Sequence, residues 1–262
     1  MRSEVFDAAL EWIAATTLTD HALKLTFHGG EPLLAGHDWY CRSLSILRRR
    51  FGDRLKLDIQ TNLWLLDDEY CNLFREYGVS IGTSLDGPEA INDAQRGVGY
   101  FARTMAGIEI ARRHGLTAGV ICTFTRRSAP HYQEVFEFFA EQRLCFSVHA
   151  AVDALGRDND HDLTSGANLS GLALTPTEHA DLFIALFDYY YANTTRTRVS
   201  IFDSMARSIS VGQGGLCTFS DCLGGYLTIA SDGGIFSCNR FTYHPQWRLG
   251  WAGCRSSPAW LT

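Results

Sequence analysis

The chain has 262 residues, of which 46% are hydrophobic and 20% are charged. This length and composition are typical of a globular protein with one large domain, alone or with a smaller unit. The formal net charge of -6 argues against a general nucleic-acid surface, which needs clustered lysine and arginine. No apolar run approaches the ~18 residues that cross a bilayer, and the first residues lack the pattern of a signal peptide. We therefore expect a cytoplasmic protein that binds neither nucleic acid nor a membrane.

The region before residue 153 alternates short β-rich runs with amphipathic segments. The segments between the runs place apolar residues three or four positions apart, as one face of a helix does. Such a βα series folds into a parallel sheet or barrel with its ligand chemistry at the carboxyl ends of the strands. The motifs HGG, QTN and SLDG are therefore expected at one rim. The predicted strands lie in ALKLTFHGG, LKLDIQTN, VSIGTSLDG, TAGVICTFT and LCFSVHAAV.

The alternation of strands and helices stops after residue 152, where a polar stretch rich in Gly, Asp and Asn predicts a long loop. A helix is predicted to follow Thr175, with Glu178 as the acid of a capping box. The stretch YLTIASDGGIFSC predicts a hairpin, because Asp-Gly-Gly suits a tight turn between two strands. The predicted units are a partial barrel (1–152), a loop with helices that close it (153–212) and a small C-terminal α+β unit (213–262).

Polar groups at the predicted strand ends suit a zwitterionic ligand. Gly29 and Gly30 let a backbone approach a ligand closely, and Glu31 can hold an ammonium group. For Gly-Gly-Glu alone, a plain strand-to-helix turn is the stronger interpretation. Amides, hydroxyls, a carboxylate and a guanidinium at the next two strand ends favour a ligand that joins an amino acid to a nucleoside. These further residues are Gln60, Thr61, Asn62, Ser84, Asp86 and Arg96.

Four stretches of the chain resemble a known family. FHGGEPLL, IQTNLWLLDDEY, GTSLDGPEAINDAQR and the cysteine-rich C-terminal stretch look like the radical S-adenosylmethionine (SAM) enzymes with a SPASM or twitch extension. This group contains anaerobic sulfatase-maturating enzymes and ribosomal-peptide-modifying maturases. The resemblance covers nearly the whole chain. It implies an α/β fold: a partial (β/α)6 TIM-like barrel lacking its first strand, followed by the start of a small α+β SPASM or twitch unit.

The same resemblance implies a SAM site at the rim. Gly29, Gly30 and Glu31 would meet the methionyl amino group of SAM. Ser84 and Arg96 match positions that contact SAM in sulfatase maturases. The remaining residues assigned to the cofactor site are Gln60, Thr61, Asn62 and Asp86.

Iron–sulfur ligands are also implied. In relatives, a CxxxCxxC loop after the first barrel strand holds a [4Fe–4S] cluster, and no such spacing occurs in this chain. The sequence is therefore expected to be truncated at both ends and to lack this loop. Cys217, Cys222 and Cys238 match ligands of an auxiliary cluster, of which only part would be present. Cys254 is either a substitute fourth thiolate or, as the simpler interpretation, a tail cysteine without a role.

One substitution bears on the reaction. Asn239 stands where sulfatase maturases have an aspartate proposed as a base, and an amide cannot take up a proton at neutral pH. The predicted function is a radical SAM/SPASM maturase that uses a 5′-deoxyadenosyl radical to cross-link or oxidise a side chain of a peptide or protein. A reductant such as flavodoxin or ferredoxin would serve it. The alternatives are a formylglycine-forming sulfatase maturase and a catalytically silent fragment that binds only SAM or peptide.

The 262-residue polypeptide itself is expected not to cleave SAM, because the three cluster thiolates of the CxxxCxxC loop do not occur in it. The measurement is formation of 5′-deoxyadenosine after anaerobic reconstitution with iron, sulfide and dithionite. Turnover above a protein-free control would contradict this expectation.

Overall fold

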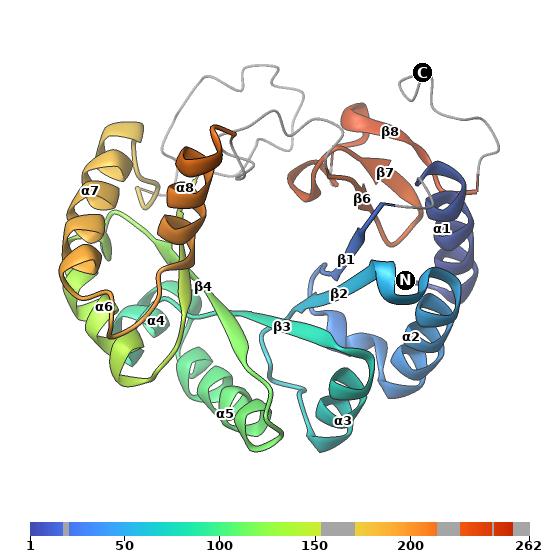
Figure 1. Ribbon diagram of the computed structural model, residues 1–262, viewed down its shortest axis with the longest axis horizontal. Helices are drawn as coiled ribbons and strands as arrows, with labels where there is room; N and C mark the ends of the chain where they lie inside the picture. Colours follow the sequence, from blue (N-terminus) through green and yellow to red (C-terminus); the bar gives the residue numbers. More distant parts are fainter. Residues whose placement is uncertain (18–20, 153–170, 214–225, 243, 254–262) are drawn as a thin grey trace.

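The computed structural model describes residues 1–17, 21–152, 171–213, 226–242 and 244–253. Its main element is a five-stranded parallel sheet in the order β1-β2-β3-β4-β5, curled into an open half-barrel (Figure 1). All five predicted strands are present, so the predicted partial α/β barrel is confirmed. The strands are β1 (Leu23–Phe27), β2 (Leu55–Gln60), β3 (Val79–Ser84), β4 (Ala118–Phe124) and β5 (Phe146–Ala150).

Helices cover the outer, convex side of this sheet (Figure 1). The helices predicted between the strands are confirmed as α2, α3, α5 and α6, whereas α4 was not predicted. Within the described ranges, no helix has both the length and the apolar composition needed to cross a membrane. The helices are α1 (Ser3–Thr16), α2 (His37–Phe51), α3 (Asp68–Tyr77), α4 (Glu89–Arg96), α5 (Tyr100–Arg113), α6 (Tyr132–Glu141), α7 (Pro176–Ala192) and α8 (Ser200–Val211). Short 3-10 turns include Pro32–Ala35, Gly52–Arg54, Ala129–His131, Asn239–Phe241 and Pro245–Trp247.

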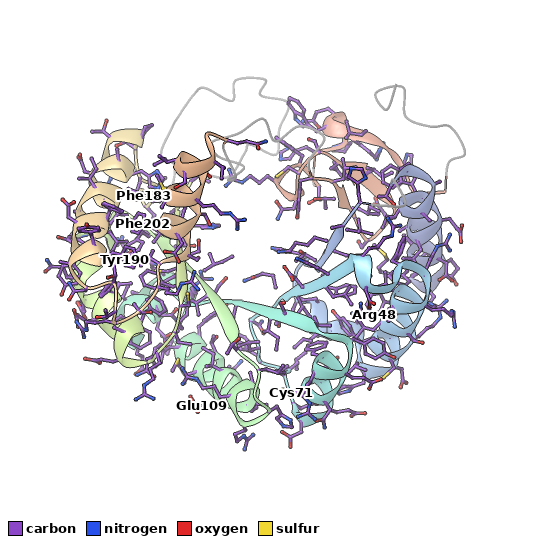
Figure 2. All side chains as sticks on the ribbon, viewed as in Figure 1. Arg48, Cys71, Glu109, Phe183, Tyr190 and Phe202 are labelled. Atoms are coloured by element: carbon purple, nitrogen blue, oxygen red, sulfur yellow. The ribbon has the colours of Figure 1, made fainter. Side chains whose placement is uncertain are left out.

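The two faces of the sheet differ because side chains alternate along each strand. On β2, Leu55, Leu57 and Ile59 are buried under the helices, and the residues between them are partly or fully exposed. The register pairs Asp58 with Ser80 and Gln60 with Gly82, so polar positions of neighbouring strands share the concave face. A closed TIM barrel fills this space with apolar side chains. Here the concave face of β2 and β3 is polar, and the described side chains leave open space inside the half-barrel, which gives room for a ligand (Figure 2).

The predicted capping box at the start of α7 is confirmed. Glu178 N–H donates to Thr175 Oγ1 (3.2 Å), and Thr175 N–H donates to the Glu178 carboxylate (2.8 Å). Arg126 binds the same carboxylate through two nitrogens, at 2.9 and 3.0 Å. These hydrogen bonds, that of Arg126 first, lower the pKa of Glu178 to about 2. The start of α7 is thereby fixed to the end of β4.

The C-terminal residues form a second, antiparallel sheet in the order β6-β7-β8. Its first two strands, β6 (Thr228–Ile229) and β7 (Gly234–Phe236), make the predicted hairpin, with Gly233 at φ +95° in the turn. Strand β8 (Arg248–Trp251) was not predicted. The unit lies beside α1 (Figure 1), and a Cβ atom on Gly233 would come 3.5 Å from Val5 Cγ1. The predicted boundaries of the three units stay predictions.

Gly107 of α5 allows a close approach to the loop after β2. Leu63 in that loop has φ +67°, and a Cβ on Gly107 would lie 2.4 Å from Leu63 Cβ and 2.7 Å from Leu63 O. Gly107→Ala should therefore destabilise the fold by about 1–3 kcal/mol, although alanine favours helix formation by about 1 kcal/mol. Urea unfolding checks this value. Gly250→Ala is the control, since nothing lies within 4 Å of a Cβ there; equal effects of the two changes would contradict the packing argument.

Candidate functional site

The Glu31 carboxylate joins the ends of β1 and β2. Its Oε1 accepts hydrogen bonds from Thr61 Oγ1 (2.6 Å) and Leu33 N (3.0 Å), and its Oε2 accepts one from Asn62 N (2.9 Å). The structure thus brings the Gly-Gly-Glu and Gln-Thr-Asn motifs together, as expected for one rim. A carboxylate offers about four acceptor positions. One position therefore remains for a donor on a ligand.

Gly29 and Gly30 leave the backbone beside Glu31 uncovered. Gly29 has φ +131°, which side-chain-bearing residues rarely adopt, and nothing lies within 4 Å of a Cβ built on either glycine. The Gly29 N–H donates to His28 Nδ1 at 2.7 Å, so this ring nitrogen is an acceptor. A ligand can lie against the Gly29–Gly30 backbone without displacing a side chain.

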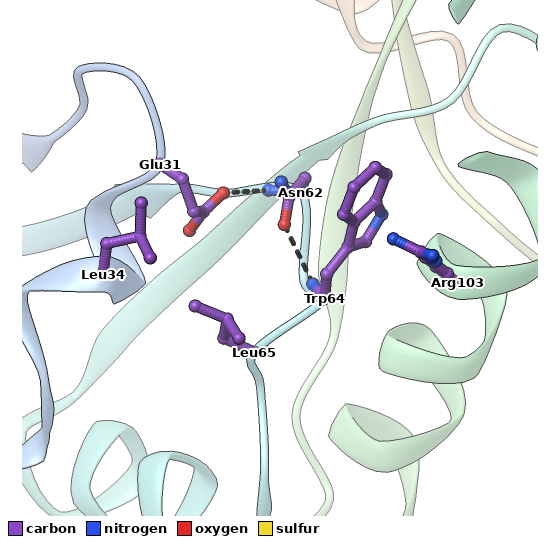
Figure 3. Close-up of a pocket in the computed structure, with 6 residues that line it drawn as sticks. All are labelled: Glu31, Leu34, Asn62, Trp64, Leu65 and Arg103. Carbon is purple, nitrogen blue, oxygen red and sulfur yellow. Dashed lines mark hydrogen bonds between the residues drawn. The ribbon is translucent and has the colours of Figure 1, made fainter. Parts of the chain in front are cut away.

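An open pocket of about 490 Å³ lies against Glu31 (Figure 3). Trp64 forms one side of the pocket. Its backbone N–H donates to Asn62 Oδ1 (2.9 Å), and its indole Nε1–H donates to Thr104 Oγ1 (3.3 Å). The Arg103 guanidinium lies 4.8 Å from the centre of the Trp64 ring. Sequence reasoning missed Trp64 and Arg103. The signal in the sequence was an aromatic residue two positions after the Gln-Thr-Asn motif, in the loop that follows β2. The lining residues are Glu31, Leu34, Asn62, Trp64, Leu65 and Arg103.

Gln60 links the ends of β2 and β3. Its Nε2 donates to Ser84 Oγ at 3.4 Å. A Cβ on Gly82 would lie 2.3 Å from Gln60 Oε1, so the Gln60 side chain passes over Gly82. The glycine in GTS is therefore what lets the amide reach the neighbouring hydroxyl, and both groups face the concave side.

Asp86 lies beneath the rim instead of facing it. The residue is 2% exposed, and its carboxylate accepts from Arg96 Nε (2.6 Å), Arg96 Nη2 (2.9 Å), Gln95 Nε2 (2.9 Å) and Thr123 N (2.8 Å). All of its acceptor positions are used by the protein. Asp86 therefore fixes the direction of the Arg96 guanidinium.

Arg96 keeps part of its side chain accessible. Its side chain is 22% exposed, and its guanidinium carbon lies 5.3 Å from the Tyr100 ring centre. Burial acts to lower the pKa of Arg96, but the hydrogen bonds and charge of Asp86 outweigh burial and raise it. Asp86 thus holds a fixed cation close to the end of β3.

Of the three cysteines assigned to the auxiliary cluster, only Cys238 lies among the described residues. Cys238 and Asn239 follow β7, and Cys238 Sγ lies 3.4 Å from Asn239 Oδ1. Cys217, Cys222 and Cys254 fall outside the described residues, so convergence of the thiols stays a prediction. Among the residues that the structure does describe, no group of three His, Cys, Asp or Glu side chains is placed to hold a metal ion.

The curled parallel sheet with its Gly-Gly-Glu rim has the form of a radical SAM half-barrel. A model of the Radical SAM superfamily matches residues 2–139, and the chain belongs to this superfamily. An uncharacterized protein of Methanothermobacter thermautotrophicus is 42% identical over 190 residues, covering 72% of this chain and 69% of that protein. A cysteine-type anaerobic sulfatase-maturating enzyme of Clostridium perfringens is 26% identical over 259 residues, covering 95% of this chain and 67% of the enzyme. The predicted relationship to sulfatase maturases is confirmed.

Solved structures share the fold. Native anSMEcpe with bound AdoMet superimposes with a TM-score of 0.82 at 22% identity, covering 100% of this chain and 71% of the other. The same protein with AdoMet and Cp18Cys peptide gives a TM-score of 0.78 at 22% identity, covering 100% of this chain and 72% of the other. The chain thus spans roughly seven tenths of their length.

Replacement of Asp86 tests its role in holding Arg96. Asp86→Asn removes the charge that compensates a largely buried guanidinium, so it should destabilise the fold by about 3–5 kcal/mol, as for a broken buried ion pair. Urea unfolding measures the change. Asp181→Asn, at an exposed position of α7, is the control and should have little effect. A small effect of Asp86→Asn would mean that Arg96 does not depend on this carboxylate.

Proposed function

We propose that the rim binds SAM and that the protein uses it to modify a side chain of a peptide or protein by radical chemistry. The observation that carries this proposal is the Glu31 carboxylate, which spans two strand ends and keeps one acceptor position beside the bare Gly29–Gly30 backbone. An ammonium group is the ligand that such a position favours, because a charge-assisted hydrogen bond is stronger than a neutral one.

The other rim residues fit the rest of SAM. The Gln60–Ser84 pair offers an amide and a hydroxyl to polar groups of the ligand, with Thr61 and Asn62 holding Glu31 in place. Arg96 would meet an anionic or hydroxyl group, and Asp86 is assigned the role of positioning Arg96 rather than of contacting SAM. SAM bound to a reduced [4Fe–4S] cluster supplies a 5′-deoxyadenosyl radical. The chain's own part is to orient SAM and to keep water from the reacting atoms.

The polar concave face is the proposed place for the substrate. It lies next to the rim and is open in the described half-barrel. The peptide-bound form of anSMEcpe supports a peptide or protein as the substrate class. An auxiliary cluster at Cys217, Cys222 and Cys238, a flavodoxin or ferredoxin as reductant, and a cytoplasmic location remain part of the proposal.

A second candidate is formylglycine formation. The match to a cysteine-type anaerobic sulfatase-maturating enzyme favours it, whereas the amide at Asn239 disfavours it because an amide is not a base. Mass spectrometry of a cysteine-containing peptide after reaction separates the two. Conversion of cysteine to formylglycine supports the second candidate, and loss of two hydrogens with a new side-chain bond supports cross-linking.

Replacement of Glu31 tests the SAM site. Glu31→Gln keeps the shape of the side chain but loses the charge, so SAM should bind more weakly by about 1.5–3 kcal/mol, the range for a hydrogen bond to a charged group. Isothermal titration calorimetry of the chain joined to a CxxxCxxC cluster loop measures the affinity. Circular dichroism confirms folding, and Glu76→Gln on the exposed side of α3 is the matched control. An unchanged affinity would make Glu31 a turn residue only.

A further inference from the structure

His149 occupies the concave face of β5, the last strand of the half-barrel. The register pairs Ser84 of β3 with Ile121 and Ile121 with Ser147, and it pairs Thr123 with His149. His149 is therefore on the same face as Ser84, two residues nearer the carboxyl end. With strands about 4.8 Å apart and a rise of about 3.3 Å per residue, the two Cα atoms lie roughly 12 Å apart along the sheet. His149 thus faces the space beside the proposed SAM site.

The His149 ring offers a lone pair that no described residue occupies. His149 is exposed on the concave side, and its imidazole ring forms no hydrogen bond with another described residue. Glu31 keeps one acceptor position, which the ammonium group of SAM takes in the proposed function; the Asp86 carboxylate is held by protein donors, and His28 Nδ1 accepts from Gly29 N. With SAM bound as proposed, the His149 imidazole is a base that remains available to a substrate at this rim.

Arg240 connects this ring to the C-terminal unit. Partial desolvation by the surrounding protein, and after it the charge of Arg240, lower the pKa of His149, which favours the neutral ring. Arg240 directly follows Asn239 in the turn after β7, and its charge acts on the His149 ring. Helix α8 also packs on β5; its charged residues are Asp203, which pairs with Arg198, and Arg207.

The proposed reaction requires a base. Abstraction of a hydrogen atom from a substrate carbon leaves a carbon radical. Oxidation to a new bond then releases one proton, from the neighbouring O–H, S–H or N–H group, and one electron. The electron goes to an acceptor of the iron–sulfur class, and the proton needs a neutral or anionic acceptor near the radical. Asn239 offers only an amide, which has no proton affinity at this pH.

Resting on the proposed function, we propose that His149 is this proton acceptor: its imidazole nitrogen takes the proton of the substrate heteroatom while the bond at the adjacent carbon forms. Both the radical source and the base would then be held by one parallel sheet. The C-terminal turn with Arg240 would line the other side of the substrate.

The first experiment tests whether Arg240 lies close to His149 and does not require catalytic turnover. The ring pKa of His149 in the 262-residue chain is measured by NMR titration, with His149→Gln to assign the signal. We expect a value below the ordinary 6.5 and a rise in Arg240→Gln, because a positive neighbour disfavours the protonated ring. An unchanged pKa in Arg240→Gln would overturn the proposed placement of this turn beside His149.

The catalytic role is tested with the chain joined to a CxxxCxxC loop and a synthetic cysteine-containing peptide as the probe. His149→Gln should still form peptide-dependent 5′-deoxyadenosine, whereas modified peptide per 5′-deoxyadenosine should fall by about 100-fold or more, as for loss of a general base. Product formation in the parent chain should rise with pH through the His149 pKa, and this dependence should be absent in His149→Gln. His114→Gln, at the opposite end of the sheet, is the matched control.

The outcomes separate this inference from the proposed function. Equal yields of modified peptide per 5′-deoxyadenosine in His149→Gln and the parent would overturn the role of His149. Loss of 5′-deoxyadenosine in His149→Gln with the fold intact would instead make His149 a binding residue, and that also overturns it. If the parent chain forms no peptide-dependent 5′-deoxyadenosine, the proposed function fails and the catalytic role of His149 fails with it, while the NMR titration still decides whether the Arg240 turn lies beside His149.

Discussion

The hydrogen bonds of one carboxylate hold the rim together. Glu31 accepts from Leu33 in its own turn and from Thr61 and Asn62 at the end of the next strand. Without it, these three donors at a partly buried strand end would lose their partner, at about 1–3 kcal/mol for each group left unsatisfied. The same three contacts fix the direction of the fourth acceptor position. The residue that closes the local fold is therefore also the one best placed to hold a cation.

Parallel pairing decides which other groups reach that position. Because the register pairs Asp58 with Ser80 and places Gln60 and Ser84 on the same face, polar side chains of β2 and β3 fall together on the concave face. The apolar residues between them are buried under the outer helices. A one-residue slip would exchange the two faces. The polar interior is thus a consequence of the same alternation that builds the core.

Periodicity in the sequence predicted the strands, the intervening helices and the meeting of the strand-end motifs, because these depend on local patterns. It could not tell that Asp86 points inward, since an acid in SLDG can equally face a ligand or an arginine ten positions later. The place of Gly82 under Gln60 depends on a contact between strands that no local pattern shows. Strand β8 was missed because it is four residues long, mostly exposed and paired with residues far away in the sequence.

The parallel sheet and the C-terminal unit carry different functional groups. The parallel sheet carries the rim at β1, β2 and β3 and the imidazole at β5, so relative motion of the C-terminal unit would leave the distance between them unchanged. That unit presents an amide at Asn239 and a cation at Arg240. Desolvation and, after it, the Arg240 charge lower the pKa of His149, which favours the neutral ring that a proton acceptor needs, and the cation would also attract an anionic group of a peptide. A base on the barrel and a cation on the C-terminal unit would therefore fix a substrate from both sides while only one of the two groups exchanges a proton with it.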